Sequence, residues 1–164
     1  MAKSTFTETI RIEASIQDVW AILADVGGIA DWNPGLIGSQ TTNDIQGLGA
    51  ARHCIIDARH NLDEEVVHFE PEHAITFRIT RSTLPIQSAD IKFALAGAGK
   101  QTDVSVSPSY RLKYGVFGRL IDAMIVSKAY RRGMRDLLWG LKVHAEDRGF
   151  PRRPGFGRHP AHAV

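Results

Sequence analysis

The spacing of hydrophobic residues changes along the chain and separates helical regions from extended ones. Residues 15–25 have the repeat of an amphipathic helix, with apolar side chains three, four and seven positions apart. Those side chains are Ile16, Val19, Trp20 and Leu23. Ser15 and Asp18 suit the first turn, because a serine hydroxyl accepts from the backbone and an acidic group favours a helix N-terminus. Gly27-Gly28 ends this helix, and a short second helical turn is expected at 29–32.

Residues 36–112 read instead as a series of strands, and an earlier strand is expected through 6–12. Their apolar residues alternate with polar ones, and glycine, proline and asparagine mark the turns between the segments. The six expected strands are 36–42, 50–57, 62–70, 74–81, 88–96 and 102–112. The connections are short, which favours antiparallel hairpins.

Helical spacing returns after Tyr114 and predicts one long helix over roughly 115–148. One face of this helix carries Leu120, Ala123, Met124, Ser127, Met134, Leu138, Leu141 and Ala145. Gly149 and Pro151 end it. Residues 150–164 are basic and poor in apolar side chains, and we expect a flexible tail there.

The order of these elements predicts an α+β domain over residues 1–149. A seven-stranded curved antiparallel sheet would wrap around the long C-terminal helix, with two short helices after the first strand, which is the helix-grip arrangement. Side chains alone rarely fill the gap between a curved sheet and one helix. We therefore expect an internal cavity.

Composition agrees with a globular protein of 164 residues, since 43% of the residues are hydrophobic and 23% are charged. No apolar run is long enough to span a bilayer, so stable membrane insertion is not expected. Cys54 is the only cysteine, which excludes an intramolecular disulfide and fits a reducing compartment. With no apolar signal core near the N-terminus, we expect a cytoplasmic protein.

The net charge is +2, but it is unevenly distributed. Residues 1–110 hold 8 Lys/Arg and 14 Asp/Glu, whereas residues 111–164 hold 12 and 4. A basic helix packed on an acidic sheet explains this asymmetry. A basic face for nucleic acid or anionic lipid is the alternative. The chain has no dense basic run interleaved with aromatic residues, so no nucleic-acid partner is expected.

Several short stretches resemble the START-like, SRPBCC superfamily, and more narrowly its polyketide cyclase/dehydrase-type group of bacterial proteins. The matching stretches are 12–20, Trp32-Asn33-Pro34, 47–52, 63–71, 115–118 and 138–142. The resemblance covers about residues 5–148 and implies a helix-grip fold around a small hydrophobic ligand. Because this fold serves carriers, receptors and enzymes, it does not specify a function.

Arg52 is the least expected residue of its strand, where it shares one face with Cys54 and Ile56. In enzymes of this superfamily, an Arg at the matching position acts with a Glu on the next strand. The resemblance aligns that Glu with Glu64, whereas strand alternation places Glu65 inside unless a bulge shifts the register. A cavity Arg–Glu pair could polarise a carbonyl and move a proton, or it could orient a ligand. A surface ion pair of little energetic value is the remaining interpretation.

The residues expected to contact a ligand are mostly apolar and lie on inward faces or at the cavity mouth. They are Trp32, Phe77, Leu84, Phe93, Tyr110, Met124 and Met134. The hydroxyls of Tyr110 and Tyr130 could meet a cavity ligand, or they could reach solvent instead. The seven histidines show no metal-ligand spacing, so neither a metal nor a cofactor is expected.

These observations favour a module that binds a small hydrophobic molecule, such as a lipid, a polyketide-like compound or an aromatic metabolite. The second hypothesis is a cyclase or dehydratase that uses Arg52 with Glu64 or Glu65. The third is an interaction or stress protein whose cavity is incidental. Neither the ligand nor the oligomeric state follows from the sequence.

Overall fold

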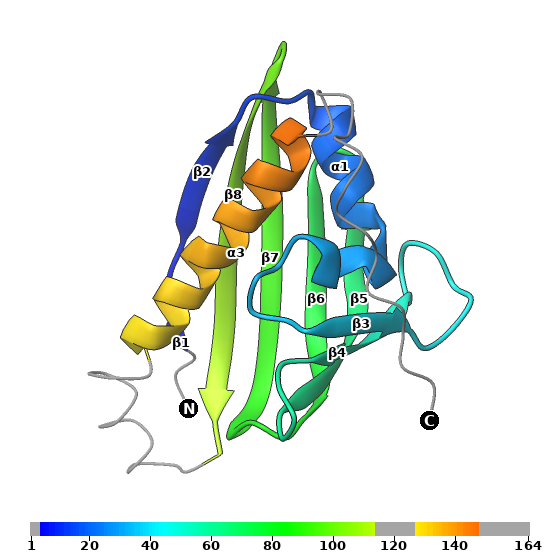
Figure 1. The fold of residues 1–164 in the computed structure, drawn as a ribbon, viewed down its shortest axis with the longest axis vertical. Coiled ribbons are helices and arrows are strands. Elements are labelled where there is room, and N and C mark those ends of the chain that lie inside the picture. Colours follow the sequence, from blue (N-terminus) through cyan, green and yellow to red (C-terminus); the bar gives the residue numbers. More distant parts are fainter. Residues whose placement is uncertain (1–3, 114–126, 148–164) are drawn as a thin grey trace.

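One antiparallel sheet and three helical elements make up residues 4–113 and 127–147, the parts of the chain that the computed structural model describes (Figure 1). The strands are β1 Ser4–Thr5, β2 Glu8–Ile12, β3 Gly38–Thr41, β4 Ala51–Ile55, β5 Asn61–Glu70, β6 Ala74–Ser82, β7 Ile86–Ala98 and β8 Gln101–Leu112. The helical elements are α1 Ile16–Ala24, the 3-10 helix η1 Val26–Asp31 and α3 Ser127–Asp147.

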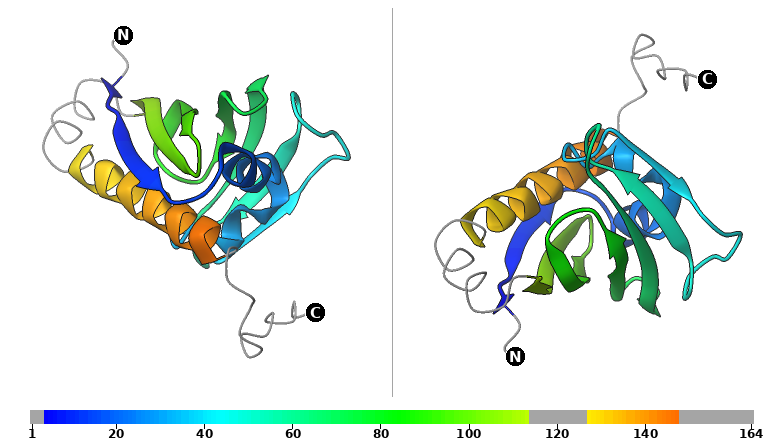
Figure 2. Two further views of the ribbon diagram at one scale, coloured as in Figure 1. Left: turned by 90° about the horizontal axis from the view of Figure 1, so that it is seen from above. Right: turned by 90° about the horizontal axis from the view of Figure 1, so that it is seen from below.

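The strands from β3 to β8 form consecutive hairpins, and each pairs with its neighbour in the chain. Both β1 and β2 pair with β8, so they are two parts of one interrupted edge strand. This gives the seven-stranded antiparallel sheet that the alternation of apolar and polar residues predicts. The sheet curves, and α3 lies along its concave side (Figure 2). The α+β helix-grip fold is therefore confirmed.

The helix α1 begins as its sequence predicts. Ser15 caps it, since its hydroxyl accepts a hydrogen bond from the backbone N–H of Asp18 at 3.2 Å. The following helical turn, η1, is longer than expected. Ser39 links it to β3 by two hydrogen bonds. Its Oγ donates to the carbonyl of Gly27 at 2.6 Å and accepts from the N–H of Ala30 at 3.1 Å. These bonds fix η1 beside one end of the sheet.

The register of β5 shifts at Val67, because Val66 pairs with Phe77 while His68 pairs with Thr76. The extra residue lets Phe69 and Val66 share the concave face although their positions differ by an odd number. A bulge of this kind reverses the parity of the strand on either side of it. Inward positions in β5 before the bulge are consequently even-numbered.

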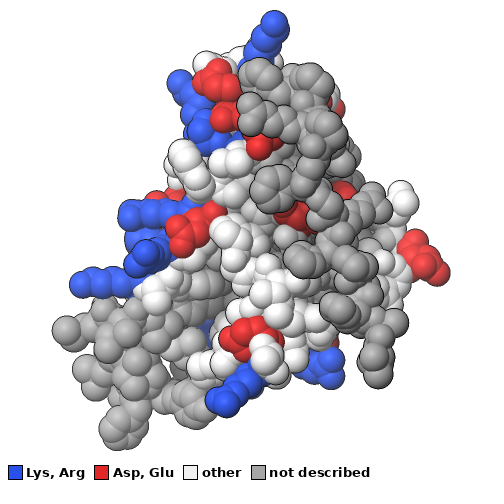
Figure 3. Space-filling model, in the orientation of Figure 1, with Lys and Arg blue, Asp and Glu red and all other residues white. Residues whose placement is uncertain are grey.

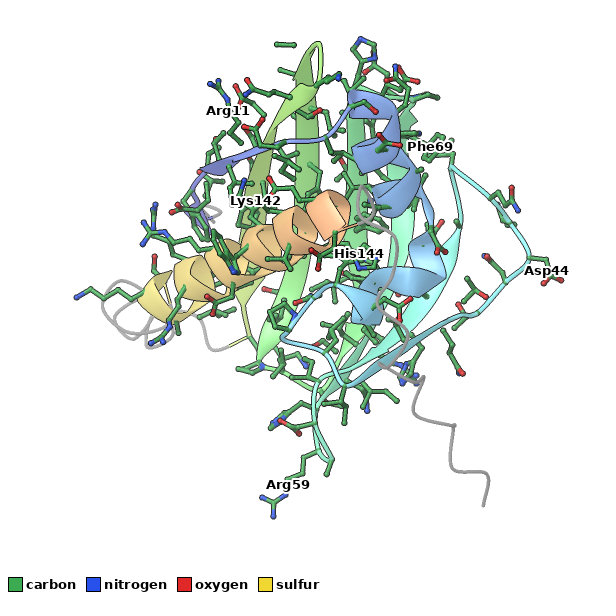
Figure 4. The ribbon with its side chains drawn as sticks, turned by 45° about the horizontal axis from the view of Figure 1, so that its top comes forward. Arg11, Asp44, Arg59, Phe69, Lys142 and His144 are labelled. Atoms are coloured by element: carbon green, nitrogen blue, oxygen red, sulfur yellow. The ribbon has the colours of Figure 1, made fainter. Side chains whose placement is uncertain are left out.

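The described part of α3 packs its apolar side against the sheet and α1. The buried residues are Met134, Leu137, Leu138, Leu141 and Ala145. Its basic side lies along β2, where Arg131 and Arg135 form ion pairs with Glu8 at 2.7 and 2.9 Å. Lys142, labelled with Arg11 in Figure 4, donates to the backbone carbonyl of Arg11 at 2.8 Å. Lys and Arg side chains gather on the side of the molecule where α3 and β2 lie (Figure 3).

The expected start of the long helix and the expected tail fall at 115–126 and 150–164, outside the described residues. Within the described ranges, no helix combines the length and hydropathy that a membrane span requires.

Candidate functional site

A cavity of about 500 Å³ lies between the concave face of the sheet and α3. Three parts of the fold form its walls: β4 to β8 supply the sheet side, η1 and the loop after it supply one end, and α3 supplies the opposite side. Most of the lining is aliphatic or aromatic, and Leu84-Pro85-Ile86 contribute where β6 connects to β7. A pocket of this volume and character suits a small hydrophobic ligand.

The polar groups of the cavity centre on Arg52 and Glu64, which face each other on β4 and β5. Arg52 Nε lies 2.7 Å from Glu64 Oε2, and the two side chains are 3% and 5% exposed. A buried charge is very costly without a partner, so the opposite charges must be kept together. The bulge at Val67 explains why strand alternation, read from Phe69, points to the wrong glutamate.

Glu65 is exposed and lies on the convex face of the sheet, opposite Arg78 of β6. The structure therefore brings Arg52 and Glu64 together in the cavity and excludes Glu65 from it. The sequence left Glu64 and Glu65 open, and the glutamate in the cavity is Glu64, the one that the family resemblance aligns.

Two further contacts hold Arg52 in place, and one holds Glu64. Arg52 Nη1 donates to the backbone carbonyl of Val26 at 3.2 Å, which ties the guanidinium to η1. Its Cζ lies 3.9 Å from the centroid of the Phe77 ring, a cation–π contact. Cys54 Sγ lies 3.7 Å from Oε2 of Glu64, the oxygen that Arg52 also contacts. Together these contacts place the charged pair rigidly on the cavity wall.

Cys54 lines the cavity as a neutral thiol. Burial, together with the negative charge of Glu64, raises the pKa of Cys54 to about 12. A thiol is a poor nucleophile when it stays protonated, so Cys54 serves as a small wall residue with a weak donor.

Two tyrosines form the other polar part of the wall. The rings of Tyr110 on β8 and Tyr130 on α3 meet edge to face, with centroids 4.7 Å apart. Phe6 contacts the Tyr130 ring in the same manner at 5.9 Å. The Tyr130 hydroxyl is buried and makes no hydrogen bond with the described residues. Burial, then Glu64 and Tyr110, raise the pKa of Tyr130, so the hydroxyl stays protonated.

Of the residues expected to contact a ligand, five line the cavity: Phe77, Leu84, Phe93, Tyr110 and Met134. Trp32 does not. It is buried beneath α3, where a Cβ at Gly140 would lie only 2.0 Å from the Trp32 carbonyl oxygen. Met124 lies outside the described residues.

Tyr130, which the sequence analysis pairs with Tyr110, lines the cavity as well. It precedes Met134 by four positions, so helical spacing places both on one face of α3. Among residues 4–113 and 127–147, no group of three or more His, Cys, Asp or Glu side chains could hold a metal ion.

The curved sheet, the long helix and the apolar cavity between them define a helix-grip fold, the fold that the resemblance of the sequence implies. The chain belongs to the family described as polyketide cyclase/dehydrase and lipid transport, whose model matches residues 3–146. Among curated proteins, none matches the sequence.

Solved structures share the fold at low sequence identity. The Zhui aromatase/cyclase from Streptomyces sp. R1128 is 16% identical, with a TM-score of 0.76 over 90% of this chain and 96% of that one. A START superfamily protein from Mycobacterium smegmatis is 15% identical, with a TM-score of 0.72 over 87% and 97%. A norcoclaurine synthase point mutant from Thalictrum flavum, in complex with a transition-state analogue, is 14% identical, with a TM-score of 0.70 over 90% and 97%. At these identities the likeness concerns the fold.

Proposed function

We propose that this protein binds a small hydrophobic molecule in its cavity, with the polar end of the molecule turned toward Arg52 and Glu64. The main support is an apolar cavity of about 500 Å³ whose described wall residues include one ion pair, Arg52–Glu64. Ligand pockets are typically a few hundred cubic ångströms, mostly apolar, with a few polar groups that fix orientation. The family description, which includes lipid transport, supports the same function.

A neutral apolar dye, N-phenyl-naphthylamine, tests the proposal directly. Its fluorescence should rise on addition of the folded protein and saturate at one dye per chain. Absence of saturable binding would contradict the proposal and favour an interaction or stress protein whose cavity is incidental.

Gly133 on α3 offers a way to block the cavity without disturbing the sheet. It lines the cavity, and a Cβ built there would meet no heavy atom within 4 Å. Gly133→Trp should therefore place an indole in the cavity and lower dye affinity by roughly tenfold or more, because little room is left for a ligand. Gly133→Ala is the matched control, since it alters the same position without filling the cavity, and it should bind as the wild type does. Equal affinities for all three proteins would place the dye elsewhere.

Catalysis of a cyclase or dehydratase type is the second candidate function, and the buried Arg52–Glu64 pair favours it. Arg52 could donate a hydrogen bond to a ketone oxygen while Glu64 removes a proton from the adjacent carbon. The enolate formed could attack a second carbonyl, and loss of water would then complete an aromatic ring. The Zhui aromatase/cyclase has the same fold, which makes this chemistry reasonable to test.

Arg52→Met combined with Glu64→Leu distinguishes the two functions, because it removes the ion pair without leaving a lone buried charge. A carrier should retain neutral dye binding in this variant and show no turnover in any form. If the protein is an enzyme, the wild type should convert a poly-β-ketone substrate, and the double variant should lose that turnover. Extraction of any molecule that copurifies with the wild-type protein would supply the natural ligand.

A further inference from the structure

The side of α3 that is turned away from the sheet carries exposed apolar residues. Trp139 and Val143 lie one helical turn apart on this outer side, and they are 60% and 43% exposed. The buried stripe of the helix, which includes Leu138 and Leu141, faces the other way. Tryptophan is highly buried on average in folded proteins, so an exposed one beside an exposed valine suits a surface that meets a partner.

The same side of α3 is basic in its first described half. Residues 127–135 contain four Lys/Arg and no Asp/Glu. Arg131 and Arg135 pair with Glu8 of β2, but the Glu8 side chain is only 14% exposed, whereas the two arginines are 41% and 63% exposed. Any partner therefore meets the guanidinium side of these ion pairs, and the buried carboxylate lies behind it.

Arg132 adds a positive charge that no described carboxylate pairs with, and it is exposed. The exposed acidic residues of α3 are Asp136 and Asp147, so the positive charge lies mainly toward the start of its described part. Arg135 and Trp139 border one shallow groove between β2 and α3, which joins the basic and the apolar parts into one surface. Lys and Arg side chains visibly gather there (Figure 3).

A basic helix side with an exposed tryptophan suits the interface of an anionic lipid bilayer. The indole ring is apolar with a polar N–H, which favours the level of the headgroups, and Lys and Arg are attracted to anionic lipids. Two exposed apolar side chains offer little to a stable protein partner, because such interfaces normally bury about 800 Å² on each side. A reversible contact with a membrane surface needs less apolar area when cations contribute.

We propose that the outer side of α3 docks the protein on anionic membrane surfaces, with Trp139 among the headgroups and Arg132 and Arg135 on lipid phosphates. Such docking goes beyond ligand binding, since it brings the protein to the place where hydrophobic molecules are concentrated. The family description, which includes lipid transport, is compatible with it. Docking uses the outer side of α3, so its failure would leave dye binding in the cavity unaffected.

Flotation of the full chain with lipid vesicles tests the docking. Vesicles of phosphatidylcholine mixed with phosphatidylglycerol should bind the protein at least about tenfold more tightly than phosphatidylcholine alone, and added salt should weaken the binding. Trp139 is the exposed one of the three tryptophans, so emission should shift to shorter wavelength on the mixed vesicles and fail to shift in Trp139→Phe. Absence of binding, or equal binding to both kinds of vesicle, would overturn the proposal.

A pair of charge reversals locates the basic part of the surface. Arg132→Glu should lower affinity for the mixed vesicles by about tenfold or more, because it replaces attraction by repulsion. Arg59→Glu is the matched control, since Arg59 is equally exposed but lies at the β4–β5 hairpin, away from α3 (Figure 4), and its effect should be much smaller. Equal effects of the two reversals would place the vesicle contact elsewhere, such as the basic residues 150–164, and would overturn the assignment to α3.

A second pair of substitutions tests the apolar part. Trp139→Ala should lower vesicle affinity by about fivefold or more, because the indole no longer enters the interface. Leu48→Ala removes a side chain that is 63% exposed on the loop between β3 and β4, and it should leave vesicle affinity unchanged. Both changes are on the surface, so the fold should persist. A wild-type protein that ignores vesicles but forms a dimer that Trp139→Ala dissociates would assign this side of α3 to a second copy of the chain and refute membrane docking.

Discussion

Arg52 and Glu64 face each other directly across β4 and β5, with Nε and Oε2 2.7 Å apart and both side chains almost completely buried. Each side chain supplies the opposite charge that offsets the desolvation cost of burying the other. Removing one partner of such a pair strands a charge, whereas removing both eliminates the desolvation cost together with the attraction.

Arg52→Met should therefore destabilise the protein by about 3–5 kcal/mol, because Glu64 is left in the cavity wall without its cation. Adding Glu64→Leu to that variant should restore most of the loss, and the double variant should be at least as stable as the wild type. Urea unfolding of the three proteins measures the differences. Additive losses in the double variant would contradict this account of the pair.

The sequence specifies the fold well because most of its elements carry their own periodic signal. The β-strand boundaries agree with the alternation to within a few residues, and Ser15 marks the start of α1 correctly. The site is harder to predict because it depends on single-residue irregularities. The bulge at Val67 moves the inward position from Glu65 to Glu64, and nothing in the local alternation announces it.

Trp32 shows a second limit of such reasoning. A large apolar residue in a loop suits either a cavity mouth or a buried contact, and only the path of α3 decides between them. That path passes the Trp32 backbone so closely that position 140 has no room for a Cβ. Long-range contacts of this kind leave no periodic trace in a sequence.

Gly140→Ala should consequently destabilise the protein by about 1–3 kcal/mol or more, since the added methyl group would lie 2.0 Å from the Trp32 carbonyl oxygen and 2.8 Å from Pro34 Cδ. Gly133→Ala, on the same helix with open space around its Cβ, should stabilise it by about 0.5–1 kcal/mol. Chemical denaturation of both variants gives the comparison. Similar effects at the two glycines would show that helix propensity, and not the close approach, governs position 140.

Cys54 should make the protein sensitive to alkaline pH. In the folded protein its pKa is raised from 9.0 to about 12, mainly by burial, so the unfolded chain releases this proton at lower pH than the folded one. The stability due to the protonated thiol is complete below about pH 9 and is lost as the pH rises toward 12. Cys54→Ala removes this dependence, so the wild type should lose up to about 1.4 kcal/mol per pH unit relative to the variant across that window. Parallel stability curves for the two proteins would contradict the assignment.

Glu8 should make the attachment of α3 to β2 sensitive to acid. Its hydrogen bond with Arg135 lowers its pKa below the ordinary 4.5, burial opposes that change, and Arg131 lowers the pKa further. A carboxylate with a lowered pKa contributes stability above its unfolded pKa and loses it as the pH falls through the folded value. Glu8→Gln should reduce stability by about 1 kcal/mol or less at neutral pH, because both ion pairs are partly exposed. The difference from the wild type should shrink below about pH 4.5, where the wild-type carboxylate becomes protonated as well.

Asp44→Asn is the control, since Asp44 lies on the loop between β3 and β4, away from α3 (Figure 4), and it should show no such pH-dependent difference. Thermal melts at a series of pH values measure all three proteins, and a Glu8→Gln deficit that persists unchanged in acid would show that the ion pairs are not its cause.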